Sequence, residues 1–376
     1  MLRERARAEP DRLVYTHLRD GERDEVSVNF AQLWDRSRAL GEFLRARGLV
    51  DQRVLLLYPP GLDYAEALFA CFIAGVIAVP EGPPDPRRPE RNMARLRAVA
   101  RDARIAAVLT VAATLPARAV DPAAFTDVDW IATDTLEGLP STEPELPPSD
   151  ALAYLQYTSG STATPRGVML SHQNLAANCA AIEQTYATGP DSVMVSWVPS
   201  FHDLGLVYGV AMPVWSGFRA VSLAAADFAR RPLRWLQAID SYRGTHSIAP
   251  DSAYAITAAK VRLAEARGLD LSSWETALNG AEPIRARTID RFTEVFAQFG
   301  WRRTSMHPAY GLAEFTLAAV AKVRGSTPVE RDVDALALTR GALVEARAGG
   351  QSRRLVSSGR AAPSTGVAIV DPATGR

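Results

Sequence analysis

Two kinds of apolar pattern alternate along the chain. Short continuous apolar runs, such as Val54 to Tyr58, are typical of strands buried on both faces, whereas a 3.6-residue apolar spacing predicts a helix. In the first half these patterns predict, in order, helix 30–47, strand 54–58, helix 63–75, strand 76–79, helix 91–102 and strand 105–111. In the second half they predict strand 193–198, helix 232–242, strand 245–249, helix 252–266, a strand ending at Leu278 and helix 285–299. This alternation predicts an α/β fold whose parallel sheets are covered by helices on both faces.

Three stretches depart from this alternation. Residues 116–148 are rich in Pro, Asp, Glu and Thr, which predicts a long surface excursion. Residues 213–223 predict a turn followed by a strand. After Val323 the pattern weakens to short β-like pieces at 355–358 and 366–370, separated by turns.

Composition narrows the class of protein. The chain has 376 residues, of which 47% are hydrophobic and 22% charged, as expected for a globular protein with a large core. The formal net charge is zero, so no nucleic-acid or acidic-membrane partner is indicated. The two cysteines, Cys71 and Cys179, have apolar or small neighbours, which favours buried free thiols in a reducing compartment. The N-terminus lacks an apolar signal segment, and the longest apolar run, 65–80, is too short for a membrane span, so we expect a cytoplasmic location.

The stretch from Tyr154 to Met169 carries the clearest chemical signal. A strand-like run, 151–157, is followed by small hydroxyl residues and glycine, and a helix pattern resumes at Ser171. Strand, small polar loop and helix form a common phosphate site, because backbone N–H groups, hydroxyls and the positive end of the helix all meet the anion. The stretch is not a Walker A loop, since Pro165 stands where that loop has glycine and no Gly-Lys-Ser/Thr follows. The alternative is a solvated Ser/Thr/Gly turn.

This stretch resembles the phosphate-binding signature of the adenylate-forming enzymes, a superfamily of acyl-CoA synthetases, peptide-synthetase adenylation domains and luciferases. The family pattern is Thr-Ser-Gly-Ser/Thr-Thr-Gly-x-Pro-Lys-Gly, and residues 158–167 depart from it at Ala163, for glycine, and Arg166, for lysine. The resemblance implies that ATP is held by Thr158, Ser159, Gly160, Ser161, Thr162 and Gly167. It also implies that Arg166 offsets phosphate charge.

A second segment, Pro199 to Gly205, follows a predicted buried strand. Alone it could be a turn with a structural histidine, and adjacent residues on one loop are poorly placed for a Ser-His-Asp triad. It resembles the His-Asp-Leu/Met-Gly-Leu element of fatty acyl members of the family, in which the histidine lies near the substrate carboxylate. The resemblance implies a catalytic role for His202. It also implies a substrate pocket that includes Trp197, Phe201, Asp203, Tyr208 and Met212, although most of the nearby apolar residues could be ordinary core.

Two further segments match family elements. Residues 279–283, Asn-Gly-Ala-Glu-Pro, could simply be the start of a helix, but the matching family segment lies against adenine, which implies nucleotide binding by Asn279, Gly280, Ala281 and Glu282. Residues 307–314 resemble the Tyr-Gly-x-Ala/Thr-Glu element. There the resemblance implies that Tyr310 and Gly311 bind adenine and that Glu314 is a catalytic ligand to Mg²⁺. A surface glutamate at a helix start is the alternative.

The resemblance covers nearly the whole chain. It implies the large N-terminal domain of an adenylate-forming enzyme: two helix-covered, mainly parallel sheets packed together, plus the start of a small β-barrel. The expected subdomains are roughly 50–190, then 10–49 with 191–325, and finally 326–376 with an insertion and an incomplete barrel. The family's small C-terminal domain and its catalytic lysine are not found, and neither Lys260 nor Lys322 can replace that lysine. We therefore expect this chain to be poorly active by itself.

The forty-four residues between Glu314 and Gly359 separate the members of the superfamily. Residues 328–354 resemble the extra segment of the fatty acyl-AMP ligases, although a tolerated surface insertion would look similar. The resemblance implies activation of a fatty acid by ATP and Mg²⁺, release of pyrophosphate, and transfer to an acyl carrier protein or a carrier domain of a polyketide synthase or peptide synthetase. An acyl-CoA synthetase, an amino-acid adenylation domain and a non-catalytic adenylate-binding module remain alternatives.

Overall fold

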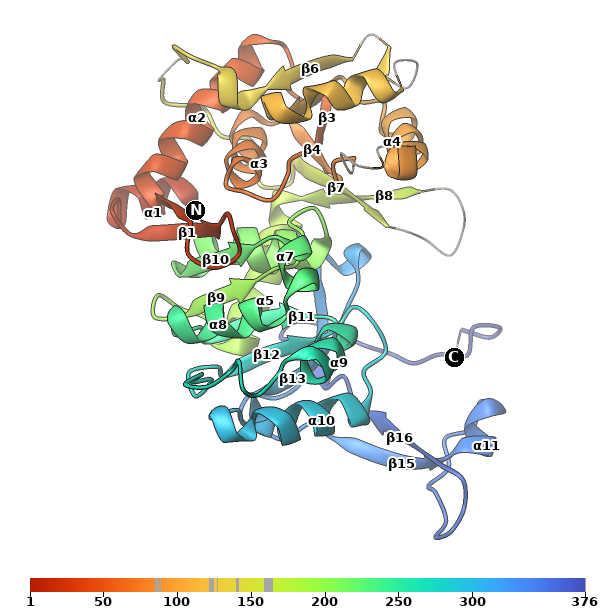
Figure 1. The fold of residues 1–376 in the computed structure, drawn as a ribbon. Helices are drawn as coiled ribbons and strands as arrows, with labels where there is room; N and C mark the ends of the chain where they lie inside the picture. The colour runs from red at the N-terminus through yellow and green to blue at the C-terminus, as the bar shows by residue number, and fades with distance from the viewer. Residues whose placement is uncertain are drawn as a thin grey trace.

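Two stacked lobes, each built on one β-sheet, make up the protein (Figure 1). The computed structural model describes residues 1–84, 88, 90–121, 125–126, 128–139, 142–158 and 165–375. Helices and mainly parallel strands alternate along the chain, so the predicted α/β class is confirmed. Among the described residues, no helix is both long and apolar enough to cross a membrane.

The first lobe is a six-stranded sheet with the order β6-β5-β3-β4-β7-β8. Its strands are β3 (Arg53–Leu56), β4 (Ile77–Pro80), β5 (Ala107–Thr110), β6 (Asp129–Ala132), β7 (Leu152–Thr158) and β8 (Arg166–Ser171). All neighbours are parallel except β7 and β8. Helices α3 (Asp63–Ala74) and α4 (Glu90–Ala103) pack on it, and α2 (Phe30–Ala46) packs on α3. Val54 and Leu55 are both fully buried but lie in different core clusters, so both faces of β3 are covered, as its apolar run predicts.

The second lobe is a nine-stranded sheet with the order β17-β14-β13-β12-β11-β9-β10-β1-β2. The strands are β1 (Leu13–Leu18), β2 (Glu25–Asn29), β9 (Val193–Ser196), β10 (Arg219–Leu223), β11 (His246–Ala249), β12 (Thr276–Asn279), β13 (Met306–Gly311), β14 (Ala318–Ala321) and β17 (Arg360–Ala361). One face is covered by residues of α8 (Leu233–Ser241), α9 (Asp251–Lys260) and α10 (Ala286–Phe296). The other face packs toward the first lobe through α5 (His172–Tyr186), η4 (Gly205–Ala211) and α6 (Met212–Ser216).

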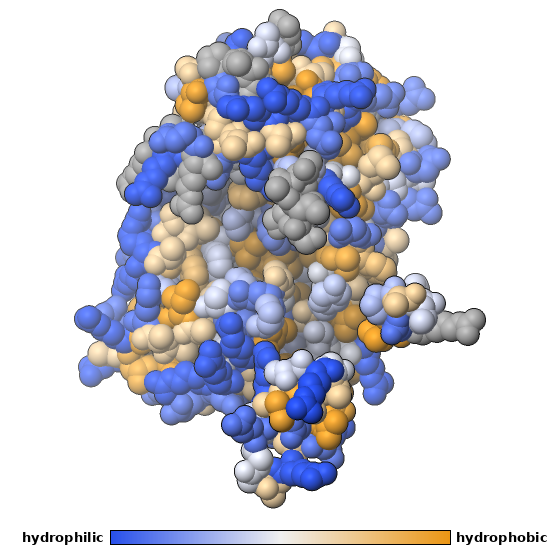
Figure 2. All heavy atoms as spheres, turned by 90° about the vertical axis from the view of Figure 1, so that its right-hand side faces the viewer, coloured by the Kyte–Doolittle hydropathy of each residue, from blue (hydrophilic) through white to orange (hydrophobic). Residues whose placement is uncertain are grey.

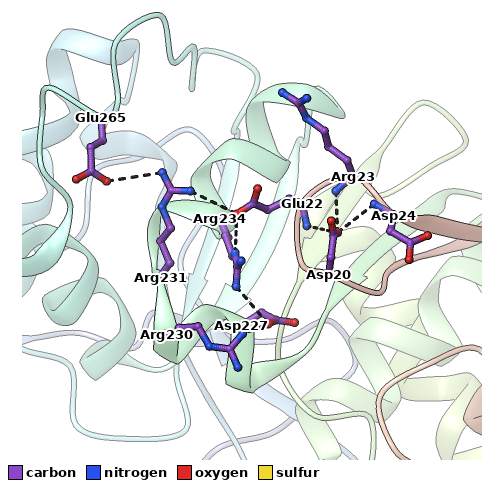
Figure 3. Close-up of polar contacts among 9 residues, drawn as sticks. All are labelled: Asp20, Glu22, Arg23, Asp24, Asp227, Arg230, Arg231, Arg234 and Glu265. Atoms are coloured by element: carbon purple, nitrogen blue, oxygen red, sulfur yellow. Dashed lines mark hydrogen bonds and ion pairs between the residues drawn. The ribbon is translucent and has the colours of Figure 1, made fainter.

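The N-terminal strands β1 and β2 belong to this second sheet although α2, which follows them, packs on α3 of the first lobe. A short helix, α1 (Leu2–Ala8), precedes them. Their turn is fixed to α7 (Ala225–Arg230) and α8 by the polar contacts drawn in Figure 3. Glu22 accepts hydrogen bonds from Arg231 and Arg234, and Arg234 also pairs with the buried Asp227. The ion pairs therefore join the start of the chain to residues some two hundred positions later.

Several sequence-based expectations are wrong in detail. The excursion 116–148 contains β6, which is buried at Trp130 and Ile131 and pairs with β5. The helix predicted at 252–266 ends at Lys260. Residues 366–370 do not form a strand, and their apolar side chains, including Ile369, are exposed.

A separate arm projects from the second lobe (Figure 1). It consists of the antiparallel strands β15 (Glu330–Asp334) and β16 (Ser352–Val356) and the helix α11 (Ala335–Thr339), and it includes most of the segment 328–354. Arg303 and Arg354 both pair with Glu330 and with Asp290 of α10, which anchors the arm. Hydrophilic and hydrophobic atoms mix on the arm, at the bottom centre of Figure 2. The described strands after β13 do not close into a barrel.

Candidate active site

A cavity of about 660 Å³ lies between the two lobes, where the carboxyl ends of strands from both sheets meet. Glu81 follows β4, Thr158 ends β7, Gly280 follows β12 and Tyr310 lies near the end of β13. His202 reaches the cavity from the segment after β9. In open α/β sheets, ligands bind in crevices outside the carboxyl ends of the strands, so this cavity is the candidate active site.

One part of the cavity wall is apolar. It includes Leu204 and Tyr208 from the η4 region, Leu278 from β12, and Leu317. The buried rings of Tyr208 and Tyr186 meet edge to face with centroids 5.7 Å apart. Phe201, one of the predicted substrate-binding residues, also lines the cavity. This wall offers apolar surface to a hydrocarbon chain.

His202 and Asp203 form an ion pair in the cavity wall. The Nδ1 of His202 lies 2.6 Å from Asp203 Oδ1, and the His202 side chain is 50% exposed. The hydrogen bond to Asp203 raises the pKa of His202, although burial opposes the shift. The turn is held to β7 because Gln156 Nε2 donates to the Phe201 carbonyl at 3.1 Å. The arrangement orients an imidazole that carries positive charge more readily than a free histidine does.

Tyr310, Gly311 and Glu314 lie together in the cavity wall, as the sequence motif predicts. Tyr310 is an aromatic side chain left 55% exposed, so its ring is available for stacking. At Gly311 a Cβ would lie 1.9 Å from the Leu317 carbonyl oxygen, and this close approach requires glycine. The Leu312 N–H donates to the same oxygen at 3.0 Å and closes the turn that carries Glu314.

The segment after β12 forms another part of the wall. Gly280 and Ala281 line the cavity, and Ala281 has a φ of +65°, the left-handed region that favours glycine. Asn279 and Glu282 do not line it. Asn279 is fully buried, and the Glu282 carboxylate accepts the N–H of Ser252 at the start of α9. These two side chains hold the segment in place.

The predicted phosphate stretch is only partly described. Ser159, Gly160, Ser161 and Thr162 lie outside the described residues. Thr158 lines the cavity, and its strand partner is Arg166, which is exposed and does not line it. Gly167 faces the Tyr157 ring, since a Cβ there would lie 2.9 Å from Tyr157 Cζ.

The helix predicted to resume at Ser171 is confirmed, but a strand separates it from the phosphate stretch. Strand β8 comes between them and returns antiparallel to β7, with Ser171 opposite Leu152. Helix α5 begins there, with Ser171 as its N-cap and Asn174 completing the capping box. The positive end of α5 thus lies beside Leu152, at the opposite end of the β7–β8 pair from Thr158 and Arg166.

Two predicted substrate residues lie outside the cavity wall. The Trp197 ring stacks on Phe228 with centroids 4.0 Å apart, in the aromatic core on the other face of the sheet. Met212 is fully buried at the start of α6. Neither side chain is among those that surround the cavity.

An ion pair that the sequence patterns missed also lines the cavity. Arg95 of α4 donates to both carboxylate oxygens of Glu81, at 2.7 and 3.0 Å, and to the Tyr157 carbonyl at 3.1 Å. Burial raises the pKa of Glu81, and the neighbouring Arg95 opposes that shift. Glu81 lies just after the end of a predicted strand. The prediction of His202 as a site residue rests partly on the same position, because His202 also follows a predicted strand. Nothing in the sequence indicates that Arg95 would reach it.

The residues around the cavity fit a magnesium nucleotide. The Glu314 carboxylate is exposed and forms no ion pair with any described residue. No group of three potential ligands occurs in the described part of the chain, but Mg²⁺ on a nucleotide needs only one or two carboxylates because phosphates and water complete its shell. Of the two lysines, Lys322 is buried and donates to the carbonyls of Thr304 and Ser326, and Lys260 ends α9; neither lines the cavity.

These features define the class of protein. The family of AMP-binding enzymes matches residues 2–376, and the chain therefore belongs to that family.

Individual relatives within this family are ligases of fatty acids. The chain is 39% identical, over its whole length, to the medium-chain fatty acid–acyl carrier protein ligase JamA of Moorena producens, and covers 65% of it. It is 36% identical over its whole length to the long-chain fatty acid–AMP ligase FadD26 of Mycobacterium marinum, and covers 66% of it. The crystal structure of a fatty acyl-adenylate ligase from L. pneumophila, in complex with acyl adenylate and pyrophosphate, superposes with a TM-score of 0.89 at 33% identity. That match covers 99% of this chain and 65% of the other, so the chain spans about two thirds of its relatives' length.

Proposed function

We propose that this chain binds a fatty acid and ATP in a reaction that activates the acid as an acyl adenylate and releases pyrophosphate. The observation that carries the proposal is a single cavity with two kinds of wall. Leu204, Tyr208 and Leu317 supply apolar surface, and Thr158 and Glu314 supply polar groups. The names of the relatives, which are ligases of a fatty acid with AMP or with an acyl carrier protein, support the same interpretation.

The reaction joins two anions, so the site must reduce their repulsion. A carboxylate oxygen attacks the α-phosphorus, and the bond from that phosphorus to the bridging oxygen of pyrophosphate breaks. Two unit charges 4 Å apart repel by about 4 kcal/mol at an effective dielectric of 20. His202, whose pKa is raised by Asp203, is the cavity side chain that we assign to the fatty acid carboxylate. Its positive charge would offset part of that repulsion.

Tyr310 and the Gly280–Ala281 segment are assigned to the adenine ring. The ring of Tyr310 is exposed in the cavity and can stack on a base, which is worth about 0.5–1.5 kcal/mol for an aromatic pair. Thr158 and the loop that follows it are assigned to the phosphates. The Glu314 carboxylate would hold Mg²⁺, which supplies positive charge to the triphosphate when it is bound. Arg166, outside the cavity wall, would add a cation only at longer range.

The acceptor of the acyl group is proposed from the relatives alone. JamA is named as a ligase that acts on an acyl carrier protein, and peptide-synthetase adenylation domains are among the structural neighbours. We infer that the acyl adenylate passes to the thiol of a carrier protein or carrier domain. AMP would leave as the thioester forms.

Chain-length dependence tests the proposed substrate. Calorimetry with ATP and Mg²⁺ present should give affinities that rise from hexanoate to dodecanoate, by no more than about fourfold per methylene, equivalent to about 0.8 kcal/mol. Pyrophosphate release should follow the same order. An affinity that does not depend on chain length, or tighter binding of amino acids than of fatty acids, would reject the proposal.

A further inference from the structure

One carboxylate, that of Asp251, is fully buried and fixes both ends of the cavity-lining segment after β12. It is the first residue of α9, just past the carboxyl end of β11. Its Oδ1 accepts from Asn279 Nδ2 at 3.1 Å and from the Arg285 N–H at 3.3 Å. Its Oδ2 accepts from the Thr288 hydroxyl at 2.9 Å and lies 3.6 Å from Nη1 of the Arg285 guanidinium. Asn279 begins the segment, while Arg285 and Thr288 follow its end, so the carboxylate closes a loop whose middle faces the cavity.

Two further hydrogen bonds join helix α9 to this segment, and in both of them α9 is the donor. Glu282, within the loop, accepts the N–H of Ser252, and the Tyr254 hydroxyl donates to the Leu278 carbonyl at 2.9 Å. Helix α9 therefore holds the loop at its start, middle and end, and the buried donors at Asn279 and Thr288 depend on Asp251. Ala281 has a positive φ, which is unfavourable for a residue other than glycine. Such a conformation persists only where several surrounding contacts fix the backbone, as they do in this loop.

We propose that Asp251 is a positioning residue that holds Gly280 and Ala281 in the conformation that receives the nucleotide. The proposal rests on the proposed function, because that function assigns the nucleotide to this wall. Asp251 does not touch the cavity itself. Leu204, Tyr208 and Leu317 of the apolar wall belong to other segments, while Leu278 directly precedes Asn279 but has its carbonyl held by Tyr254 and not by Asp251. The residue therefore acts on nucleotide affinity and leaves fatty acid affinity unchanged.

Two substitutions separate positioning from general stability. In Asp251→Asn the amide oxygen can still accept from Asn279 and Arg285, and the amide N–H can donate to the Thr288 hydroxyl. In Asp251→Ala the three hydrogen-bond donors lose their acceptor in a buried site, and the Arg285 guanidinium loses its carboxylate partner. Asp227→Asn is the matched control, because Asp227 is also a buried carboxylate that holds neighbouring elements together (Figure 3), and it is not among the residues that line the cavity.

The first measurement is calorimetry with ATP·Mg²⁺ and, separately, with dodecanoate. Asp251→Ala should weaken ATP binding at least tenfold with dodecanoate affinity within twofold, and Asp251→Asn should recover ATP binding to within about threefold. Asp227→Asn should change neither affinity. Wild-type ATP affinity in Asp251→Ala, or an equal loss for both ligands, overturns the proposal.

The second measurement, hydrogen–deuterium exchange, needs no ligand. Peptides covering 279–285 should exchange faster in Asp251→Ala than in the wild type and in Asp227→Asn. If Asp251→Ala does not fold, Thr288→Val takes its place, since it removes one donor and keeps the side-chain shape. Unchanged exchange at 279–285 in the folded variant overturns the proposal. A wild-type protein that binds no ATP would reject the proposed function, and the exchange result would still decide whether Asp251 positions the loop.

Discussion

Replacing Gly311 with alanine is expected to destabilise the protein and to weaken nucleotide binding together. The new Cβ would lie 1.9 Å from the Leu317 carbonyl oxygen, whereas a carbon and an oxygen in close contact are normally about 3.3 Å apart. Backbone has to move, because no flexible side chain is involved. Overpacking of this kind costs about 1–3 kcal/mol, and loss of the Leu312–Leu317 hydrogen bond adds about 1 kcal/mol.

The same movement displaces Tyr310 and Glu314. We therefore expect urea unfolding to give a free energy lower by about 2–4 kcal/mol and calorimetry to give at least a tenfold weaker affinity for ATP·Mg²⁺. Gly325→Ala is the control. Gly325 has a φ of +76° and no atom within 4 Å of the position that an alanine methyl group would occupy, so alanine there costs about 1–2 kcal/mol of backbone strain and leaves ATP affinity unchanged. If Gly311→Ala behaves like this control, the close approach does not hold the site together.

Four other outcomes are expected. The hydrogen bond to Asp203 raises the pKa of His202, so the contribution of this hydrogen bond to folding stability is complete below about pH 6.5 and is lost as pH rises through the raised pKa. Dodecanoate affinity should fall over the same pH range. His202→Gln should flatten the pH dependence of both stability and dodecanoate affinity. Glu314→Gln should remove the Mg²⁺ dependence of ATP binding, and survival of that dependence would exclude the metal role. Alanine at Ser159 and Thr162 should weaken ATP binding, and an unchanged affinity would count against the phosphate loop. The segment 328–354 is expected to prevent the use of CoA. Replacing it by a short linker, in a version of this protein that forms the acyl adenylate, should therefore permit acyl-CoA formation. Adenylate formation without any acyl-CoA would contradict that role.

Most of the alternating strands and helices were predictable from the sequence, and so was the sheet edge that carries the candidate site. Buried parallel strands leave a clear apolar signal at 54–58, and motifs that follow such strands necessarily meet at their carboxyl ends. Strand β1 left no such signal. Its buried positions include Thr16 and His17, which are accommodated by hydrogen bonds to Ser27 and Ser222, and these partners are unknown until the fold is known.

Which side chains enter the cavity was less predictable. Trp197 and Phe201 are four positions apart, yet Trp197 packs on Phe228 behind the sheet and Phe201 lines the cavity. Irregular backbone between a strand and the next helix has no fixed period, so the sequence cannot assign these residues to a face. Arg95 was missed for a related reason, because its contact with Glu81 spans two elements.

The pairing of β1 with β10 has a consequence for how the protein is made. A strand that is completed early in synthesis waits for a partner roughly 200 residues away, which at about 5–20 residues per second means on the order of 10–40 s. Until then β1 can pair only with β2, and an isolated two-stranded hairpin is marginally stable in water. The nascent chain therefore carries an unprotected strand edge while the whole first lobe emerges from the ribosome. We expect the yield of soluble protein to depend on elongation rate and on holdase chaperones more than on the stability of the finished fold.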